Sequence, residues 1–228
     1  MLDVACGAGY PALAAAVAVQ PDGRVVATDI SPQMVIATRR RATALGLDNI
    51  EVVEMDAEHL QFADAVFDAV TNAYGLMFCP DVGRALSEAH RVLKPGGRAA
   101  FVTWDDAAKS PFFHTMLPIA AKFLSLASSD RDAPGPFRLS VPSELESLLS
   151  RTGFKDVRIE SRSMLLDCGS AAEYCQLFSD IAWRGRMTSL TEAAAAQFRE
   201  SVADVTRPHV EGDRLRLVAT SLCVMAQK

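Results

Sequence analysis

The sequence lacks the features of several protein classes. Its five cysteines include no Cys-x-x-Cys pair and have no zinc-ligand spacing. An odd number argues against a complete disulfide framework, and most of these cysteines have apolar neighbours, as reduced thiols often do. No run reaches the ~18 apolar residues of a membrane span, and the first residues show no basic-then-apolar signal sequence. We therefore expect a cytoplasmic protein with no membrane span.

Positive charge is also scarce. The chain has 23 Lys and Arg residues against 28 Asp and Glu residues, which gives a net charge of −5. Binding to nucleic acid needs a concentrated basic surface. The densest basic run, at positions 39–41, lies in a helical pattern and is interpreted as a solvated helix face. Nucleic acid is therefore not expected as the partner, and the composition does not indicate an oligomeric state.

What the 228 residues do contain, in their first half, is an alternation of short apolar runs with helical patterns. A chain of this size can bury one sizeable core. Continuous apolar strands that alternate with helices predict a parallel sheet covered on both faces. Strands are expected at 1–5, 24–29, 50–55, 67–72 and 98–103, and helices at 10–19, 31–45 and 82–93.

The second half is less regular. Residues 110–140, rich in Pro, Phe and small side chains, and residues 164–212, largely helical, are interpreted as insertions. A helix at 143–151, a strand at 157–163 and a last strand at 215–225 complete the pattern. We predict a single domain over 1–228, with a cofactor-binding half at 1–104 and insertions that shape an acceptor pocket.

A glycine loop follows the first expected strand. Gly7, Gly9 and Ala12 fit the G-x-G-x-x-A fingerprint of adenosine cofactors, and Asp29 follows Gly9 by 20 residues at the end of the next strand. Small residues let the backbone turn tightly against a ligand, and an acid at the second strand accepts hydrogen bonds from ribose hydroxyls. The match alone supports NAD as readily as S-adenosylmethionine.

Three further features favour S-adenosylmethionine. Asp3 lies inside the first strand, where a buried carboxylate is costly unless it has a partner such as the amino group of a methionine moiety. Asp56 closes the third strand, where it offers a polar group to the adenine edge. A Tyr-x-x-x-Lys pair, part of a common hydride-transfer apparatus, is missing from the sequence.

With these residues the sequence resembles the class I S-adenosylmethionine-dependent methyltransferases, most closely the ubiquinone/menaquinone-biosynthesis type (methyltransferase type 11). The resemblance extends over residues 1–104 and more loosely to the last strand. It implies a Rossmann-like, seven-stranded, mostly parallel α/β sheet with an antiparallel last strand and helices on both faces. It is carried by LDVACGAG (2–9), ATDIS (27–31), MDAE (55–58) and RVLKPGGR (91–98).

The resemblance also implies roles for individual residues. Asp3 would hold the methionine amino group, and Asp29 the ribose hydroxyls. The other cofactor-binding positions are Gly7 and Gly9 beneath the methionine, Ile30 and Met34 flanking the adenine, Asp56 and Ala57 at its polar edge, and Asn72 beside the methionine. Ala5 departs from the glycine of many members, a change that is not expected to block binding. Taken singly, Asp29 and Asp56 could instead be turn residues, and Met34 could belong to the core.

Aromatic and sulfur-containing side chains after the fourth and fifth strands suit a flat, apolar acceptor such as a quinol, phenol or polyketide. For Phe112 and Phe113, packing of the insertion is an equal alternative. His114 is the first candidate for a catalytic base and His209 the second, although each could be a surface or packing histidine. The residues expected to line the pocket are Tyr74, Met77, Phe78, Trp104, Phe112, Phe113 and His209.

Several acceptor classes are disfavoured. The segment Asn72-Ala73-Tyr74-Gly75 has no proline pair of the kind found in nucleobase amino-methylating enzymes. Adjacent acids at Asp105 and Asp106 point to different sides of a strand, so no metal site is expected. Two other functions stay open, a noncatalytic cofactor-binding or partner-binding remnant and an NAD-dependent oxidoreductase. Because the relatives carry covering helices before the first strand, which are expected to be absent here, we also expect an open site with weakened cofactor affinity.

Overall fold

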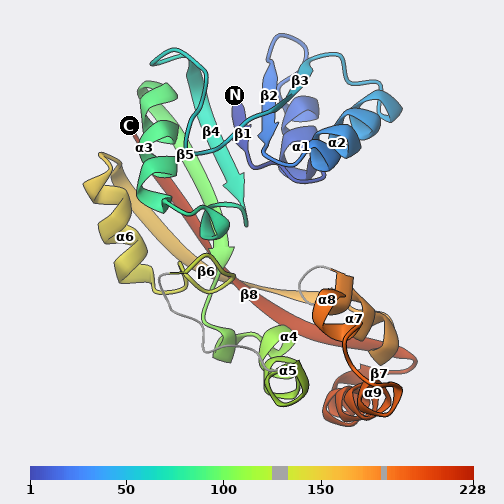
Figure 1. The fold of residues 1–228 in the computed structure, drawn as a ribbon. Coiled ribbons are helices and arrows are strands. Elements are labelled where there is room, and N and C mark those ends of the chain that lie inside the picture. Colours follow the sequence, from blue (N-terminus) through green and yellow to red (C-terminus); the bar gives the residue numbers. More distant parts are fainter. Residues whose placement is uncertain (125–132, 181–183) are drawn as a thin grey trace. The chain divides into compact units, whose positions relative to one another are not determined.

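The computed structural model describes residues 1–124, 133–180 and 184–228 (Figure 1). The chain forms two compact units. The first contains Met1–Trp104, Arg131–Ser161 and Ser221–Lys228, and the second contains Asp105–Asp130 and Arg162–Thr220. The second unit therefore gathers most of the two expected insertions, of which positions 125–132 and 181–183 lie outside the described residues. Their grouping as one domain stays a prediction.

One sheet runs through the described chain in the strand order β3-β2-β1-β4-β5-β8-β6. The β1/β2, β1/β4, β2/β3 and β4/β5 pairs are parallel, and β5/β8 is antiparallel. The predicted fold class is confirmed, with one unexpected short strand, β7, that pairs with β8. The strands are β1 (Leu2–Val4), β2 (Val25–Asp29), β3 (Ile50–Glu54), β4 (Phe67–Ala73), β5 (Leu93–Trp104), β6 (Lys155–Asp167), β7 (Val210–Glu211) and β8 (Arg214–Gln227).

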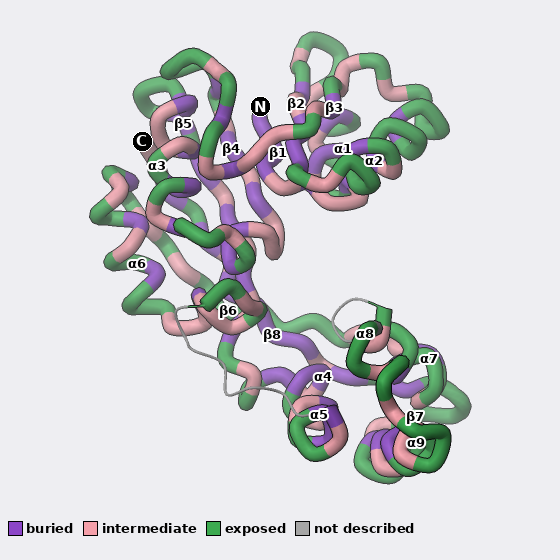
Figure 2. Tube along the Cα trace, viewed as in Figure 1, coloured by how far each residue is buried: buried purple, intermediate pink, exposed green. Residues whose placement is uncertain are grey.

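The first unit has helices on both faces of its sheet. Neighbouring residues of β2 contribute to two different hydrophobic clusters, one on each face of the sheet, because successive side chains of a strand point to opposite faces. Val25 and Ala27 pack in a cluster with residues of α1 and α2, whereas Val26 packs against a larger cluster that includes residues of α3 and α6. Figure 2 shows β1 buried along its length, whereas β4 and β5 alternate buried residues with intermediate and exposed ones. The helices are α1 (Tyr10–Ala18), α2 (Pro32–Ala44), α3 (Val82–Val92), α6 (Pro142–Arg151) and the short 3₁₀ helix η1 (Leu76–Phe78).

Local sequence explains where these helices begin. Ser31 precedes Pro32, and its side chain accepts a hydrogen bond from the backbone N–H of Met34, as an N-cap does. Asp81 caps α3 in the same way through the N–H of Arg84. These two starts follow from cap residues that are recognisable in the sequence.

The start of β5 differs from the expectation. Residues 94–97 were expected to separate helix from strand, but α3 ends at Val92 and β5 begins at Leu93. The pairing with β4 shifts in register between Phe67 and Ala69, so the Pro-Gly-Gly segment is accommodated within the strand as a bulge. Gly96, at φ 77°, supplies the backbone conformation that this irregularity requires.

The second unit packs around aromatic side chains. Phe112 lies within 5.6 Å of the rings of Phe113, Tyr174 and Phe178, measured between ring centroids. The Tyr174 hydroxyl donates to the backbone carbonyl of Phe112. The helices of the second unit are α4 (Pro111–His114), α5 (Leu117–Leu124), α7 (Ala171–Phe178), α8 (Arg184–Met187) and α9 (Glu192–Thr206), with 3₁₀ turns η2 (Ala107–Lys109) and η4 (Arg207–His209). Among the residues that the structure describes, no helix combines the length and apolar character needed to cross a bilayer.

Candidate active site

The glycine loop joins β1 to α1 in the first unit. Its backbone is tied to β2, because the N–H of Cys6 donates to the carbonyl of Thr28 at 2.8 Å. Within the loop, the N–H of Gly9 donates to the carbonyl of Cys6 at 2.9 Å. Ala5, with φ 51°, lies in the left-handed region that glycine adopts at little cost. This conformation explains why glycine suits position 5 and why alanine is tolerated there only under strain.

Asp29 supports this loop from the end of β2. Its Oδ2 accepts from the N–H of Gly7 at 2.8 Å, and its Oδ1 accepts from the N–H of Ser31 at 2.9 Å. A carboxylate oxygen has two lone-pair directions, so each oxygen keeps acceptor capacity after these bonds form. Asp29 therefore does stabilise the turn between β2 and α2, as the alternative interpretation expected. It also keeps the acceptor capacity needed to bind ribose hydroxyls.

Asp3 has a buried oxygen without a partner. Thr71 donates to Oδ1 of Asp3 at 2.7 Å, whereas Oδ2 makes no hydrogen bond within the described part of the chain. Burial raises the pKa of this carboxyl to about 6, and the hydrogen bond from Thr71 and then the nearby backbone N–H of Ala12 oppose that rise. A buried carboxylate with an open acceptor position fits a cationic amine as its partner. This orphaned oxygen is the strongest structural sign that the site takes a methionine moiety.

The expected adenine contacts divide into apolar and polar residues. Ile30 and Met34 expose 67% and 41% of their surface although both are large apolar residues. Exposed apolar side chains that follow Asp29 in the chain suit the faces of a planar base. Asp56 lies two residues after β3, where its Oδ1 accepts from the N–H of Glu58 and its Oδ2 lies 2.9 Å from Nδ1 of His59. These two contacts lower the pKa of Asp56, while Ala57 is buried in the core.

Asn72 is a scaffold residue in this structure. Its Nδ2 donates to the carbonyl of Val4 at 2.7 Å, and its Oδ1 accepts from the N–H groups of Gly75 and Leu76. The side chain therefore holds the turn after β4 against the end of β1. A contact between Asn72 and the methionine moiety stays a prediction.

Tyr74 and Trp104 form a stacked aromatic pair in the first unit. Their ring centroids are 4.2 Å apart with an interplanar angle of 28°. The Tyr74 hydroxyl lies 2.9 Å from Oγ of Ser221, and burial raises its pKa. Tyr74 has φ 60°, an uncommon conformation for a residue with a side chain. Phe78, at the end of η1, is more exposed than either ring of the pair, and Met77 beside it is buried in the core.

The remaining candidates belong to the second unit. Phe112 and Phe113 are buried in its aromatic cluster, which accounts for both by packing. His114 is exposed at the last position of α4, and His209 is partly exposed in η4. The structure brings Phe112 and Phe113 together, and separately Tyr74 and Trp104. The roles of His114 and His209 as bases stay predictions.

Two threonines contribute to the site without having been expected from the sequence. Thr71 on β4 donates to Asp3, and Thr38 on α2 donates to the carbonyl of Gly7 at 2.8 Å. Thr38 occupies the buried face of α2 together with Val35 and Ala42. The sequence offered one signal for Thr38, because it is a polar residue at a position where the helical periodicity predicts an apolar one.

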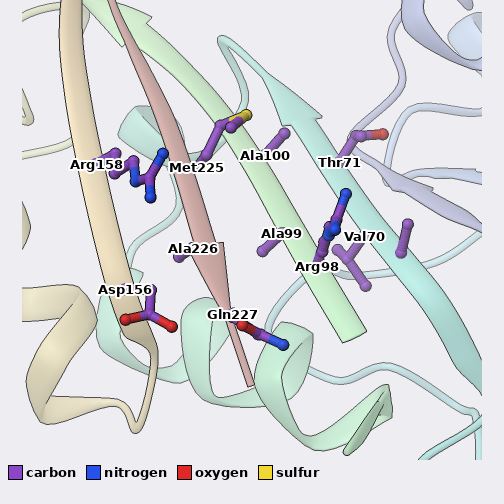
Figure 3. A pocket seen from close by; sticks show the side chains of 11 residues that line it. Val70, Thr71, Arg98, Ala99, Ala100, Asp156, Arg158, Met225, Ala226 and Gln227 are labelled. Carbon is purple, nitrogen blue, oxygen red and sulfur yellow. The ribbon is translucent and has the colours of Figure 1, made fainter. Parts of the chain in front are cut away.

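A hollow of about 640 Å³ lies on the sheet of the first unit, over residues of β4, β5, β6 and β8. Thr71, Ala100 and Met225 lie side by side on neighbouring strands and line it (Figure 3). The hollow is bordered by Arg98 and Arg158, and Thr71, which binds Asp3, is the lining residue that it shares with the candidate cofactor site. In the described residues, no three His, Cys, Asp or Glu side chains are grouped so as to hold a metal ion.

Comparison with known proteins agrees with this arrangement. A family model described as a methyltransferase domain matches residues 2–101. A demethylmenaquinone methyltransferase of Listeria monocytogenes is 32% identical over 179 residues, which cover 72% of this chain and 73% of the relative. One of Geobacillus kaustophilus is 33% identical over 174 residues, or 70% and 72% of the two chains.

Solved structures show the same fold. The YcgJ protein of Bacillus subtilis superposes with a TM-score of 0.66 at 20% sequence identity, covering all of this chain and 90% of its own. The orphaned oxygen of Asp3, the acid at the end of β2 and the exposed apolar residues Ile30 and Met34 are compatible with the family's cofactor. The chain is a member of the class I S-adenosylmethionine-dependent methyltransferases of the ubiquinone/menaquinone-biosynthesis type.

Proposed function

We propose that this methyltransferase acts in the cytoplasm on a small aromatic acceptor of the quinol or phenol type. The observation that carries the acceptor class is the half-buried stack of Tyr74 on Trp104. A flat ring gains dispersion and offset-stacking energy against such a pair, worth about 0.5–1.5 kcal/mol beyond the burial of its area. The names of the Listeria and Geobacillus relatives support the same acceptor class.

We propose that the cofactor is held by the residues around the glycine loop. Asp3 would receive the amino group, Asp29 the ribose hydroxyls, Ile30 and Met34 the faces of the adenine, and Asp56 with Ala57 its edge. Bound S-adenosylmethionine supplies an electrophilic methyl group on a sulfonium. The buried position of Asp3 makes an ammonium partner more favourable than water as its neighbour.

The second step of the proposal concerns the acceptor. Tyr74 follows Asn72 by two residues, and Asn72 binds the end of β1, so the aromatic pair and the glycine loop belong to the same end of the sheet. Parallel strands carry ligand sites at their carboxyl ends. The protein's contribution is then to orient the acceptor ring and to exclude water from the reacting atoms. A quinol or phenol oxygen, or a ring carbon activated by it, needs little help from a base, so the proposal does not depend on His114.

The free thiols of the described chain support the cytoplasmic part of the proposal. Cys6, Cys79, Cys168, Cys175 and Cys223 are all unpaired by disulfides. Burial raises the pKa of Cys6 to about 12 and that of Cys79 and Cys175 to about 11, which keeps these thiols protonated and unreactive.

The experiment is methyl transfer from labelled S-adenosylmethionine to a panel of quinols, phenols and amines, with product identification by mass spectrometry. We expect label in quinols or phenols and none in amines. Label in amines alone would refute the acceptor class. Binding of S-adenosylmethionine without transfer to any compound would support the noncatalytic alternative, and binding of NAD instead would support the oxidoreductase alternative.

A further inference from the structure

Two side chains of α2 bind carbonyl oxygens of the glycine loop. Thr38 Oγ1 donates to the carbonyl of Gly7 at 2.8 Å, and Arg41 Nη1 donates to the carbonyl of Ala8 at 3.0 Å. Residues three apart lie on the same face of a helix. One face of α2 therefore holds two successive peptide groups of the loop.

Thr38 is fully buried against the loop. A Cβ atom placed on Gly9 would lie 2.7 Å from Cγ2 and 2.9 Å from Oγ1 of Thr38, distances that real side chains do not reach. The absence of a side chain at Gly9 thus allows α2 to approach closely enough for the Thr38 hydroxyl to reach the loop. The hydrogen bond from Thr38 to the Gly7 carbonyl therefore depends on the glycine at position 9.

Arg41 binds the loop from the solvent side. Besides the carbonyl of Ala8, its guanidinium donates from Nη2 to the hydroxyl of Tyr10 at 3.1 Å and lies 4.5 Å from the centroid of that ring. Tyr10 is the first residue of α1. The planar, multiply donating guanidinium can make these contacts together, which a lysine ammonium on its flexible stem cannot reproduce.

These contacts fix which way the loop's amide groups point. In a trans peptide, the C=O of one residue and the N–H of the next point in opposite directions. Because the carbonyl of Gly7 points to Thr38, the N–H of Ala8 points away from α2. The N–H of Gly9 is already used by Cys6. The Cys6 thiol also donates to the Gly7 carbonyl, at the longer distance of 3.6 Å, so the oxygen donor that orients the Ala8 N–H is Thr38.

We propose that Thr38 and Arg41 are positioning residues for S-adenosylmethionine, which hold the glycine loop so that the N–H of Ala8 is presented to the methionine carboxylate. This inference rests on the cofactor placement proposed above. A preformed loop binds more tightly because it does not have to be ordered by the ligand. Loss of the clamp should therefore weaken cofactor binding while leaving the chemistry at saturating cofactor unchanged.

The test is calorimetric titration of S-adenosylhomocysteine into five variants of α2. Thr38→Val removes the hydroxyl at constant shape, and Thr38→Ser restores it. The matched control is Thr43→Val, because the Thr43 hydroxyl also binds a backbone carbonyl, that of Arg39, on the exposed side of the same helix. We expect about tenfold weaker binding for Thr38→Val, as for loss of one buried hydrogen bond, and near-normal binding for Thr38→Ser and Thr43→Val. Arg41→Ala should also weaken binding, compared with Arg40→Ala as its control.

Two further measurements separate positioning from a general loss of structure. The amide resonance of Ala8 should shift in Thr38→Val and return in Thr38→Ser, and KM for S-adenosylmethionine should rise without a fall in kcat. Equal affinity of folded Thr38→Val and wild type would overturn the clamp. If Thr38→Val does not fold, equal affinity of Arg41→Ala and Arg40→Ala overturns it. Asp29→Asn serves as the reference. If Asp29→Asn also binds S-adenosylhomocysteine normally, the proposed cofactor placement is wrong. If Asp29→Asn loses binding while Thr38→Val binds normally, only the positioning role of Thr38 is refuted.

Discussion

The N–H of Gly7 donates to Oδ2 of Asp29 at 2.8 Å, so the acid expected to bind the ribose also supports the glycine loop. The same carboxylate holds the N–H of Ser31 at the start of α2. A change at Asp29 therefore removes a ligand contact and two structural contacts together.

Asp29→Asn tests this double role. The asparagine amide keeps one acceptor oxygen and places an NH₂ group where the other oxygen was. The backbone N–H that faces this NH₂ group, of either Gly7 or Ser31, then loses its acceptor. Hydrogen bonds to charged groups contribute about 1.5–3 kcal/mol each, so we expect affinity for S-adenosylhomocysteine to fall at least tenfold. Titration calorimetry measures this, with the exposed Asp48→Asn as the control. Undiminished binding by Asp29→Asn would contradict the placement of the ribose.

The order of strands and helices in the first unit follows from the sequence because each element has its own local signal. In β2 the apolar run at 25–27 is followed by Thr28 and closed by Asp29, and Ser31 with Pro32 starts the next helix. The start of β5 could not be predicted this way. Its Pro-Gly-Gly segment has the composition of a turn, and only pairing with β4 draws it into a strand.

The site was predictable where one residue type has one plausible chemistry. Asp3 in an apolar strand is such a case, and the structure leaves its Oδ2 unpartnered in the described chain. The partners of Thr38 and Thr71 were not predictable, because each lies far away in the sequence. For Thr38 the sequence offered one signal, its polar side chain on the apolar face of a helix. Asn72 illustrates the converse, since tertiary contacts give it a scaffolding role that its position at a strand end does not reveal.

Ala5→Gly should stabilise the protein. Ala5 has φ 51°, and the left-handed conformation costs a residue with a Cβ about 1–2 kcal/mol. Glycine removes this strain but adds conformational freedom to the unfolded chain, worth about 0.4–1 kcal/mol. We expect a net gain of about 0.5–1 kcal/mol, measured as a higher urea midpoint. A lower midpoint with an unchanged slope would show that the Ala5 methyl group contributes packing that outweighs the strain.

Asp3 should make stability depend on pH. Its pKa is raised by burial from 3.8 to about 6, so between these values the folded chain binds a proton that the unfolded chain does not. Stability from this group is therefore full below about pH 4 and is lost as the pH rises to about 6, by about 3 kcal/mol in all. Its surroundings include Thr71, which donates to it, and the acid Asp29 and thiol Cys6, which interact with it through charge.

The measurement is urea unfolding of wild type and Asp3→Asn at several pH values from 4 to 7.5. The stability of wild type relative to Asp3→Asn should fall as the pH rises and then level off. Affinity for S-adenosylhomocysteine should move the opposite way, because its ammonium group is attracted to the ionised form that prevails above pH 6. A pH-independent difference in stability between the two proteins would show that Asp3 does not titrate in this range.

Trp104→Leu should affect the acceptor and spare the cofactor. The change removes the ring on which Tyr74 stacks, so we expect KM for a quinol or phenol acceptor to rise about five- to tenfold, as for loss of one aromatic contact. Binding of S-adenosylhomocysteine should stay within a factor of two. The control is Phe62→Leu, which disrupts a comparable aromatic pair with Phe67 in the same unit. Equal effects of both variants on acceptor KM would argue for a general packing defect.

Phe112→Ala distinguishes packing from acceptor binding in the second unit. Phe112 is buried, and its ring contacts three other aromatic rings in that unit. Removing a buried phenylalanine costs about 3–5 kcal/mol, so thermal or urea unfolding should show a large loss of stability. Leu177→Ala, at a position 40% exposed on α7, should cost far less.

Because the loss of stability could itself lower activity, the acceptor KM is measured on Phe112→Leu, whose side chain fills most of the space of the phenylalanine. An unchanged KM in that variant would assign Phe112 to packing, and a raised KM with unchanged cofactor affinity would assign it to the acceptor pocket.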